Sequence, residues 1–298
     1  MKRIRVGIFG ANRGCDNARS IMLNNAEIVA VCDKNEELLK RAQDKIPGVS
    51  TYTKFDEFIK ENMDVLYLAN YFPEHAKYAI IALEKDISVI CECLSNATMA
   101  EGVALIRAAE KSKGIYMIAE NYPFMLQNRE LAKVYKDGTL GKVMFGEGEY
   151  NHPVAPTDVA FMKKYYDSEK HWRCYLPRTY YLTHSLGPLM YATHATPRRV
   201  TAMPVYTPDR KNANPLKQTA DGAAIITILN DDDSVFRVTG CSSFGFHENS
   251  YRLACENGQI ESVRGDNKIM LCYNEWNVPE GKEQNNIYIY KKFTLYID

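Results

Sequence analysis

The sequence lacks an excess of charge of either sign, because 37 lysine and arginine residues balance 37 aspartate and glutamate residues among its 298 residues. This balance gives no electrostatic reason to expect nucleic acid or an anionic membrane as a partner. The sequence also lacks any apolar run close to the roughly 18 residues that a membrane span needs. The apolar run at its N-terminus is too short and too interrupted by glycine for a signal peptide. These absences predict a cytoplasmic protein.

Disulfide and metal signatures are missing as well. The eight cysteines form no Cys-x-x-Cys pair and lie mostly inside apolar runs, which favours buried, reduced thiols. The spacing of His152, His171 and His184 matches no common ligand pattern. We therefore predict no metal centre.

The composition that remains indicates two folded domains. Hydrophobic residues make up 46% of the chain, and the length exceeds that of one typical domain. Over the first 120 residues, short apolar runs alternate with helical periodicity, which is typical of a doubly wound parallel sheet, the Rossmann fold. The predicted strands are Ile4–Phe9, Glu27–Cys32, Val65–Ala69, Ser88–Cys91 and Tyr116–Ala119, and the predicted helices include Asn35–Lys45, Pro73–Lys85 and Met99–Lys113.

A glycine turn, Gly-Ala-Asn-Arg-Gly, follows the first strand. Glycines at such a turn let the backbone approach a pyrophosphate, so Gly10, Asn12, Arg13 and Gly14 are candidate cofactor residues. The match to Gly-x-Gly-x-x-Gly is incomplete, since Asn12 stands at the second glycine. Asp33 ends the second strand, where a carboxylate can bind a ribose diol and repel the 2′-phosphate of NADP. The turn and the acid together predict NAD; the alternative for Asp33 is a helix N-cap.

Three further segments resemble the Gfo/Idh/MocA family of NAD(P)-dependent oxidoreductases, which act mostly on sugars. They are residues 64–75 (DVLYLANYFPEH), 119–124 (AENYPF) and 140–150 (LGKVMFGEGEY). The resemblance implies that Asn70, His75, Glu92 and Asn121 contact the cofactor.

The same resemblance implies a second domain with an open, mainly antiparallel sheet, whose face often forms a dimer. The predicted strands there are Lys142–Tyr150, Arg199–Val205, Ala223–Leu229, Ser234–Cys241 and Tyr251–Cys255. We therefore predict an α/β chain with a dinucleotide-binding domain at residues 1–121 and a substrate-binding and oligomerisation domain at residues 122–298. A homo-oligomer, dimer or tetramer, is expected.

One position departs from the family pattern. Most family dehydrogenases carry Glu-Lys-Pro after the fifth strand, with the lysine beside the reacting carbon, whereas this sequence has Cys93 and Leu94 after Glu92. The NAD-dependent glycosidases of the family, which hydrolyse terminal N-acetylgalactosamine, lack that lysine too. They resemble this sequence at additional positions, namely Glu120-Asn121, Tyr150 and His152, Trp172-Arg173, and Tyr181 to Pro188. The resemblance implies that Trp172 and Arg173 lie at the cofactor site.

His184 is the leading catalytic candidate, because an imidazole titrates near neutrality and can take a hydroxyl proton. If its segment is helical, Tyr181 shares its face and the Gly187-Pro188 pair ends the segment sharply. The plainer alternative for His184 is a core histidine.

Three more residues complete the candidate catalytic set. Tyr150 and His152 lie two apart on a predicted strand and so point to one face, and Glu120 comes from the segment implied to meet the nicotinamide ribose. His152 could instead cap the strand end. We expect His194 and His247 to be surface or core residues.

Three functions stay open. The leading one is an NAD-dependent oxidoreductase that transfers a hydride from a hydroxyl carbon of a sugar, polyol or glycoside. The first alternative is an NAD-dependent glycosidase that works by oxidation, elimination, addition and reduction with recycled NAD. The second alternative is a non-catalytic nucleotide-binding protein. The expected partner in the first two is a small carbohydrate.

Overall fold

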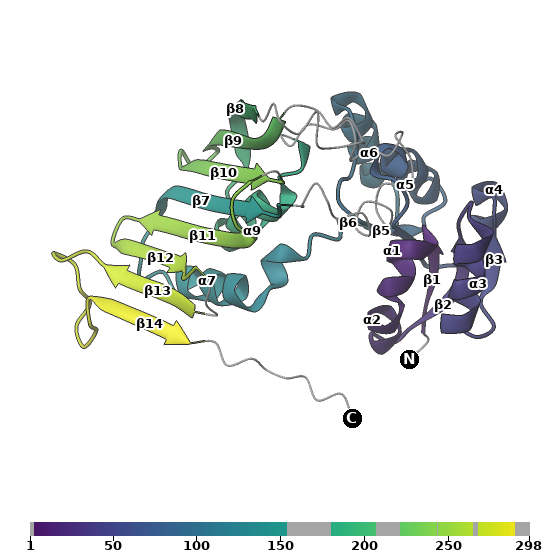
Figure 1. Ribbon diagram of the computed structural model, residues 1–298, viewed down its shortest axis with the longest axis horizontal. Coiled ribbons are helices and arrows are strands. Elements are labelled where there is room, and N and C mark those ends of the chain that lie inside the picture. The colour runs from purple at the N-terminus through teal and green to yellow at the C-terminus, as the bar shows by residue number, and fades with distance from the viewer. Residues whose placement is uncertain (1–2, 154–179, 207–220, 243, 265–267, 290–298) are drawn as a thin grey trace. The chain divides into compact units, whose positions relative to one another are not determined.

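The computed structural model describes residues 3–153, 180–206, 221–242, 244–264 and 268–289. Contacts divide the chain into two compact units, residues 1–119 and residues 120–298. The N-terminal unit contains a six-stranded sheet and the C-terminal unit an eight-stranded sheet (Figure 1). The predicted α/β fold class, a Rossmann sheet followed by a mainly antiparallel sheet, is confirmed.

All neighbouring strands of the N-terminal sheet are parallel, in the order β3-β2-β1-β4-β5-β6. Its strands are β1 (Ile4–Phe9), β2 (Ala26–Cys32), β3 (Ser50–Tyr52), β4 (Val65–Leu68), β5 (Ser88–Cys91) and β6 (Tyr116–Ile118). The helical elements are α1 (Ala11–Asp16), α2 (Ala18–Leu23), α3 (Glu36–Lys45), α4 (Phe55–Phe58), η1 (Phe72–Glu74), α5 (His75–Leu83) and α6 (Met99–Lys111). The five predicted strands are present within one residue at each end.

Two cores cover the two faces of this sheet. One core joins α4, α5 and α6 to the strands through residues such as Phe58, Leu83 and Leu66. The other joins α1, α2 and α3 to the strands through residues such as Leu39 and Ile8. Burial on both faces explains why these strands are apolar throughout rather than alternating. α6 begins with the capping box of Thr98 and Glu101 that the sequence predicts.

The C-terminal sheet has the order β14-β13-β12-β11-β7-β10-β9-β8. Its strands are β7 (Val143–Asn151), β8 (Pro197–Tyr206), β9 (Asp221–Asn230), β10 (Val235–Cys241), β11 (Glu248–Cys255), β12 (Gly258–Ser262), β13 (Lys268–Tyr273) and β14 (Asn285–Ile289). Only the pair of β7 and β10 is parallel among these strands. The helical elements are η2 (Tyr122–Phe124), α7 (Leu126–Lys136) and α9 (Thr183–Thr193).

Helices α7 and α9 pack on one face of this sheet, where Leu131 and Leu189 meet buried strand residues such as Phe236. The strand residues of opposite orientation form a second face. There Glu147 lies directly across from Arg237 and Arg252 in the strand register and pairs with both guanidinium groups, an arrangement of opposite charges that stabilises neighbouring strands.

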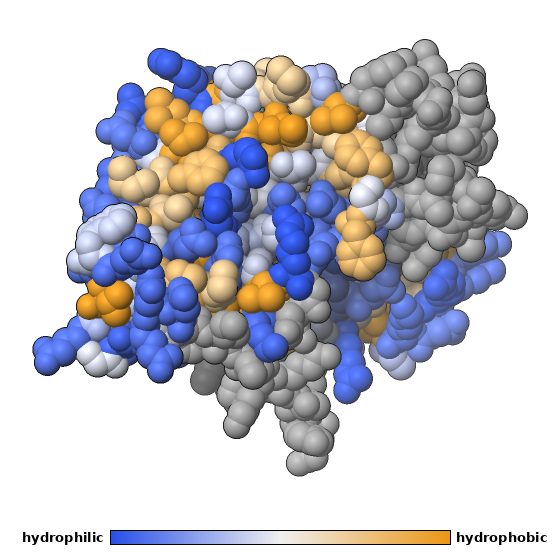
Figure 2. All heavy atoms as spheres, turned by 60° about the vertical axis from the view of Figure 1, so that its left-hand side comes forward, coloured by the Kyte–Doolittle hydropathy of each residue, from blue (hydrophilic) through white to orange (hydrophobic). Residues whose placement is uncertain are grey.

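The second face of the sheet also carries exposed apolar side chains, including Met203 and Ile225. Figure 2 shows hydrophilic and hydrophobic side chains mixed on the side of the molecule that it brings forward. The predicted homo-oligomer stays a prediction.

The predicted end of the helix at Gly187-Pro188 is wrong. α9 continues through Pro188 to Thr193, and Tyr181 lies before the helix rather than on it. Proline has no N–H, so it cannot bond the carbonyl of residue 184 four positions earlier. The hydroxyl of Tyr251 donates to that carbonyl instead, at 2.7 Å. A tertiary hydrogen bond therefore replaces the missing helical one, and the helix does not have to stop.

The seven cysteines that the structure describes are all free, and Cys174 lies outside the described residues. Burial raises the pKa of the Cys32 thiol to about 12, so this thiol stays protonated near neutral pH. None of the described helices has both the length and the apolar character required to cross a membrane.

Candidate active site

The glycine turn after β1 has the close approaches that require glycine. Gly10 has φ of 102°, and a Cβ there would lie 2.4 Å from backbone atoms of Ala69. A Cβ on Gly14 would lie 2.3 Å from the Cγ2 atom of Ile8. Both positions would clash with a side chain. The two glycines therefore allow the close packing of the first helix against β1 and the loop after β4 that a dinucleotide-binding turn requires.

Asp33 holds this turn. One carboxylate oxygen accepts from the backbone N–H of Ala11 at 2.8 Å, and the other accepts from that of Asn35 at 2.9 Å. Asn35, not Asp33, is the N-cap of α3, so the alternative reading of Asp33 as the N-cap is wrong. Its carboxylate lies at the carboxyl end of β2 beside the glycine turn, where a ribose could reach it; its cofactor role stays a prediction.

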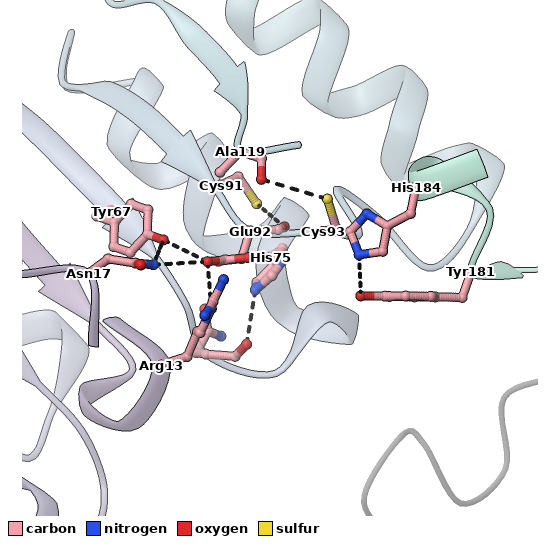
Figure 3. A network of polar contacts seen from close by, with 11 residues as sticks. Arg13, Asn17, Tyr67, His75, Cys91, Glu92, Cys93, Ala119, Tyr181 and His184 are labelled. Atoms are coloured by element: carbon pink, nitrogen blue, oxygen red, sulfur yellow. Dashed lines mark hydrogen bonds and ion pairs between the residues drawn. The ribbon is translucent and has the colours of Figure 1, made fainter. Parts of the chain in front are cut away.

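Glu92 is the centre of a polar network at the same edge of the N-terminal sheet (Figure 3). Its Oε1 atom accepts from Arg13 Nε at 3.0 Å, from the Tyr67 hydroxyl at 2.7 Å and from Asn17 Nδ2 at 3.3 Å. Burial and the neighbouring Glu92 raise the pKa of Tyr67, which keeps its hydroxyl a donor. The network fixes Arg13 of α1 through Glu92, which follows β5, and β5 is separated from β1 by β4 in the sheet. Sequence reasoning missed Tyr67 and Asn17, because no local pattern marks them.

His75 connects two loops at this edge. It is buried at the start of α5, with Nδ1 2.6 Å from the carbonyl oxygen of Leu94 and Nε2 3.0 Å from that of Asn70. Burial lowers its pKa, and the two carbonyl contacts act in the opposite direction. We infer that His75 braces the loops after β4 and β5.

The remaining predicted cofactor residues differ in what the structure describes. Asn12 is exposed in α1, and Asn121 is exposed as the N-cap of η2. Trp172 and Arg173 lie outside the described residues, as does His171.

The C-terminal unit brings Glu120, Tyr181 and His184 together. His184 Nδ1 lies 2.8 and 2.9 Å from the two carboxylate oxygens of Glu120, and its Nε2 lies 3.1 Å from the Tyr181 hydroxyl. A carboxylate can only accept, so Nδ1 carries the proton and Nε2 accepts from Tyr181. All three side chains are buried. They form one continuous chain of hydrogen bonds.

Burial acts to raise the pKa of Glu120, but its hydrogen bond to His184 and its electrostatic interaction with that ring outweigh burial and leave the pKa below its usual range. The backbone N–H of Tyr122 also donates to this carboxylate, at 3.0 Å. Glu120 is therefore ionised near neutral pH and stabilises a positive charge on His184.

Two further tyrosines enclose the imidazole. The Tyr122 ring stacks on His184, with centroids 4.1 Å apart and planes at 22°, and Tyr150 meets it edge-on at 4.7 Å. Burial, with the neighbouring Tyr150, raises the pKa of Tyr122. Tyr150 was predicted from the sequence and Tyr122 was not, although it lies within the segment AENYPF.

Helix α9 can carry His184 to this position because β7 contains Gly148. A Cβ there would lie 2.0 Å from the carbonyl oxygen of Ser185, so any side chain would push the helix away from the strand. The Tyr251 hydroxyl fixes the same turn from β11 through its bond to the His184 carbonyl. Tyr251 was missed because its role depends on the strand register.

His152 lies at the end of β7, and its ring is parallel to that of Tyr150 at 5.9 Å. Its Nδ1 lies 3.0 Å from His247 Nε2. We expected His247 to be a surface or core residue; it is exposed, but it has this polar partner. The described residues contain no group of three or more side chains suited to hold a metal ion.

Comparison with known proteins identifies the first unit. Residues 4–120 match the model of the Gfo/Idh/MocA family, described as an oxidoreductase family with an NAD-binding Rossmann fold. The predicted family resemblance and the predicted NAD-binding Rossmann fold of these residues are thereby confirmed.

Curated relatives and solved structures extend the similarity. Over 200 residues the chain is 28% identical to a "Glycosyl hydrolase family 109 protein" of Saccharopolyspora erythraea, covering 62% of this chain and 43% of the relative. The chain thus spans less than half the length of that relative.

Two solved structures share the fold. An oxidoreductase from Agrobacterium radiobacter in complex with NAD+, L-tartaric acid and magnesium has a TM-score of 0.78 at 16% identity, covering 96% of this chain and 79% of its own. The myo-inositol 2-dehydrogenase from Lactobacillus plantarum has a TM-score of 0.73 at 17% identity, covering 93% and 82%.

Proposed function

We propose that this protein uses NAD to oxidise a hydroxyl-bearing carbon of a sugar or sugar derivative. The observation that carries the proposal is the series of buried hydrogen bonds that joins Tyr181, His184 and Glu120. It occurs in a protein whose N-terminal unit matches an NAD-binding Rossmann family. Oxidation of an alcohol releases its hydroxyl proton, and this chain of groups is built to receive one.

In this proposal Tyr181 is the first acceptor of the proton, and the hydrogen bonds of His184 support that role. Both nitrogens of His184 are engaged, Nδ1 by Glu120 and Nε2 by Tyr181. The substrate hydroxyl therefore gives its proton to the Tyr181 oxygen while Tyr181 passes its own proton to His184 Nε2. Glu120 stabilises the imidazolium that forms and keeps the ring oriented. Tyr122 and Tyr150 exclude water from the ring.

The residues of the N-terminal unit fit NAD. Gly10 and Gly14 let α1 begin close against the carboxyl end of β1, Arg13 in α1 is held by Glu92, and Asp33 has its carboxylate beside Ala11 at the start of that helix. When bound, NAD supplies the oxidant for the sugar carbon. In this proposal Arg13 neutralises phosphate charge, and Asp33 binds the adenosine ribose and disfavours NADP.

A second candidate function is glycoside cleavage with the cofactor restored in each turnover. Two observations favour it: the similarity to proteins named glycosyl hydrolase family 109, and Cys93 in the place of the dehydrogenase lysine. Oxidation of a sugar carbon acidifies the neighbouring C–H bond, so the same proton chain would serve the first step of either reaction.

One screen tests both candidates. Purified protein with NAD is assayed against nitrophenyl glycosides and free sugars, with NADH and nitrophenol recorded together. Accumulating NADH supports net oxidation, whereas nitrophenol released in molar excess over NAD supports the glycosidase. If calorimetry shows that NAD binds but no compound of the panel yields NADH or nitrophenol, both candidate functions are contradicted. The remaining function is then a non-catalytic nucleotide-binding protein.

A further inference from the structure

The pair of His152 and His247 lies outside the hydrogen-bond chain just described. His152 directly follows β7, and His247 directly precedes β11, which pairs with β7 along its length. The backbone N–H of His152 also donates to the Cys241 carbonyl at 2.8 Å, at the end of β10. Three adjacent strands therefore fix where the two imidazoles meet, 3.0 Å apart and with ring planes at 71°.

This contact requires one shared proton, because two nitrogen lone pairs facing each other repel. Nδ1 of His152 meets Nε2 of His247, so the proton belongs either to His247 Nε2 or to His152 Nδ1. A histidine side chain in water favours the form protonated on Nε2. Donation from His247 leaves both rings in that favoured form, whereas donation from His152 puts both rings in the other form.

We propose that His247 is a positioning residue that donates from Nε2 to His152 Nδ1 and thereby holds His152 protonated on Nε2. The hydrogen bond at one imidazole nitrogen sets the protonation of the other. His152 then presents a hydrogen-bond donor to an oxygen of the sugar substrate. This role rests on the proposed function and deepens it. Tyr181 would accept a proton from one substrate hydroxyl, and His152 would donate a hydrogen bond to a different substrate oxygen.

The protonation state can be measured without substrate. Protein labelled with nitrogen-15 in its histidines gives two-bond proton–nitrogen NMR spectra that distinguish the two neutral ring forms, and single histidine variants assign the signals. We expect His152 to be protonated on Nε2 in the wild type. The distribution of its proton between Nδ1 and Nε2 should change in His247→Ala and return to that of the wild type in His247→Gln, whose amide N–H can donate. A wild-type His152 protonated on Nδ1, or no change in His247→Ala, would overturn the proposal.

Kinetics on a substrate found by the screen test the consequence. At metal sites, loss of the group that orients a ligating histidine costs about 10- to 100-fold. By the same orienting effect we expect kcat of His247→Ala to fall by about tenfold, with KM changed less than about twofold. His247→Gln should recover most of kcat. His247→Glu should not, because a carboxylate only accepts and draws the proton to Nδ1. Equal recovery by Glu would overturn the donor assignment.

His194→Asn is the matched control. His194 is an exposed histidine of the same unit, with φ of 61° at the end of α9, a conformation that asparagine tolerates. Its kinetics and the His152 signals should equal those of the wild type. If no substrate is found, the proposed function fails while the NMR result still decides the role of His247.

Discussion

At the residue scale, His184 is the group on which the proposed reaction depends. Removal of a general base costs about 10²- to 10⁴-fold, so His184→Ala should lose that factor in turnover while NAD affinity stays within about twofold. Tyr181→Phe should lose a comparable factor, because both residues move the same proton. The double variant should then be little worse than either single variant. Single-turnover rates of the two single variants and the double variant measure these losses, with melting temperature as the folding control. If the losses multiply in the double variant, Tyr181 and His184 do not act on the same proton.

Glu120 links this site to the pH dependence of stability. Its pKa in the folded protein lies below the ordinary value, so the folded state binds its proton less readily than the unfolded state. The resulting stabilisation is complete above the unfolded pKa of about 4.3 and disappears as the pH falls through the lower folded pKa.

We therefore expect Glu120→Gln to lower the free energy of unfolding by about 2 kcal/mol at neutral pH, the scale of a hydrogen bond to a charged group. This difference from the wild type should shrink below about pH 4. Denaturant titrations at a series of pH values measure it, and a difference that stays constant down to about pH 2 would contradict the assignment.

At the scale of single elements, α9 depends on the hydrogen bond that replaces the one lost at Pro188. Tyr251→Phe leaves the buried carbonyl of His184 without a donor, which costs about 1–3 kcal/mol. Pro188→Ala restores an N–H four residues after that carbonyl. The loss caused by Tyr251→Phe should therefore be smaller in the Pro188→Ala background, by about 1 kcal/mol. A double-mutant cycle of unfolding free energies measures the coupling, and strict additivity would contradict the proposed replacement.

The same helix shows where sequence reasoning reaches its limit. The five buried parallel strands of the first unit were predictable, because each is a short apolar run between helical segments. The glycine-proline pair at 187–188 locally predicts a helix end, and the distant Tyr251 reverses that outcome. The strands β3, β12, β13 and β14 were not predicted. β3 has only three residues, whereas β13 has the alternating burial of a half-buried strand and carried a usable pattern. The site residues found in advance lie in family motifs, whereas Tyr251 and His247 depend on strand register.

At the scale of the whole molecule, the two units have separate tasks in the proposed function, and cofactor binding can be tested through stability. A ligand at about 100 times its Kd stabilises the folded state by about 2.7 kcal/mol, so NAD should raise the melting temperature by several degrees. NADP at the same concentration should raise it less, because the Asp33 carboxylate repels a 2′-phosphate.

Asp33→Ala makes that comparison specific. The variant itself should be less stable, because Asp33 also accepts from the backbone N–H groups of Ala11 and Asn35. The quantity to compare is therefore the shift that NAD causes in each protein, not the melting temperature alone. Loss of a charge-assisted hydrogen bond weakens binding by about 1–3 kcal/mol. The rise in melting temperature caused by NAD should therefore be smaller in Asp33→Ala, and the difference between the rises caused by NAD and NADP should also be smaller. Equal NAD shifts in the wild type and Asp33→Ala would remove Asp33 from the ribose site and confine it to holding the glycine turn.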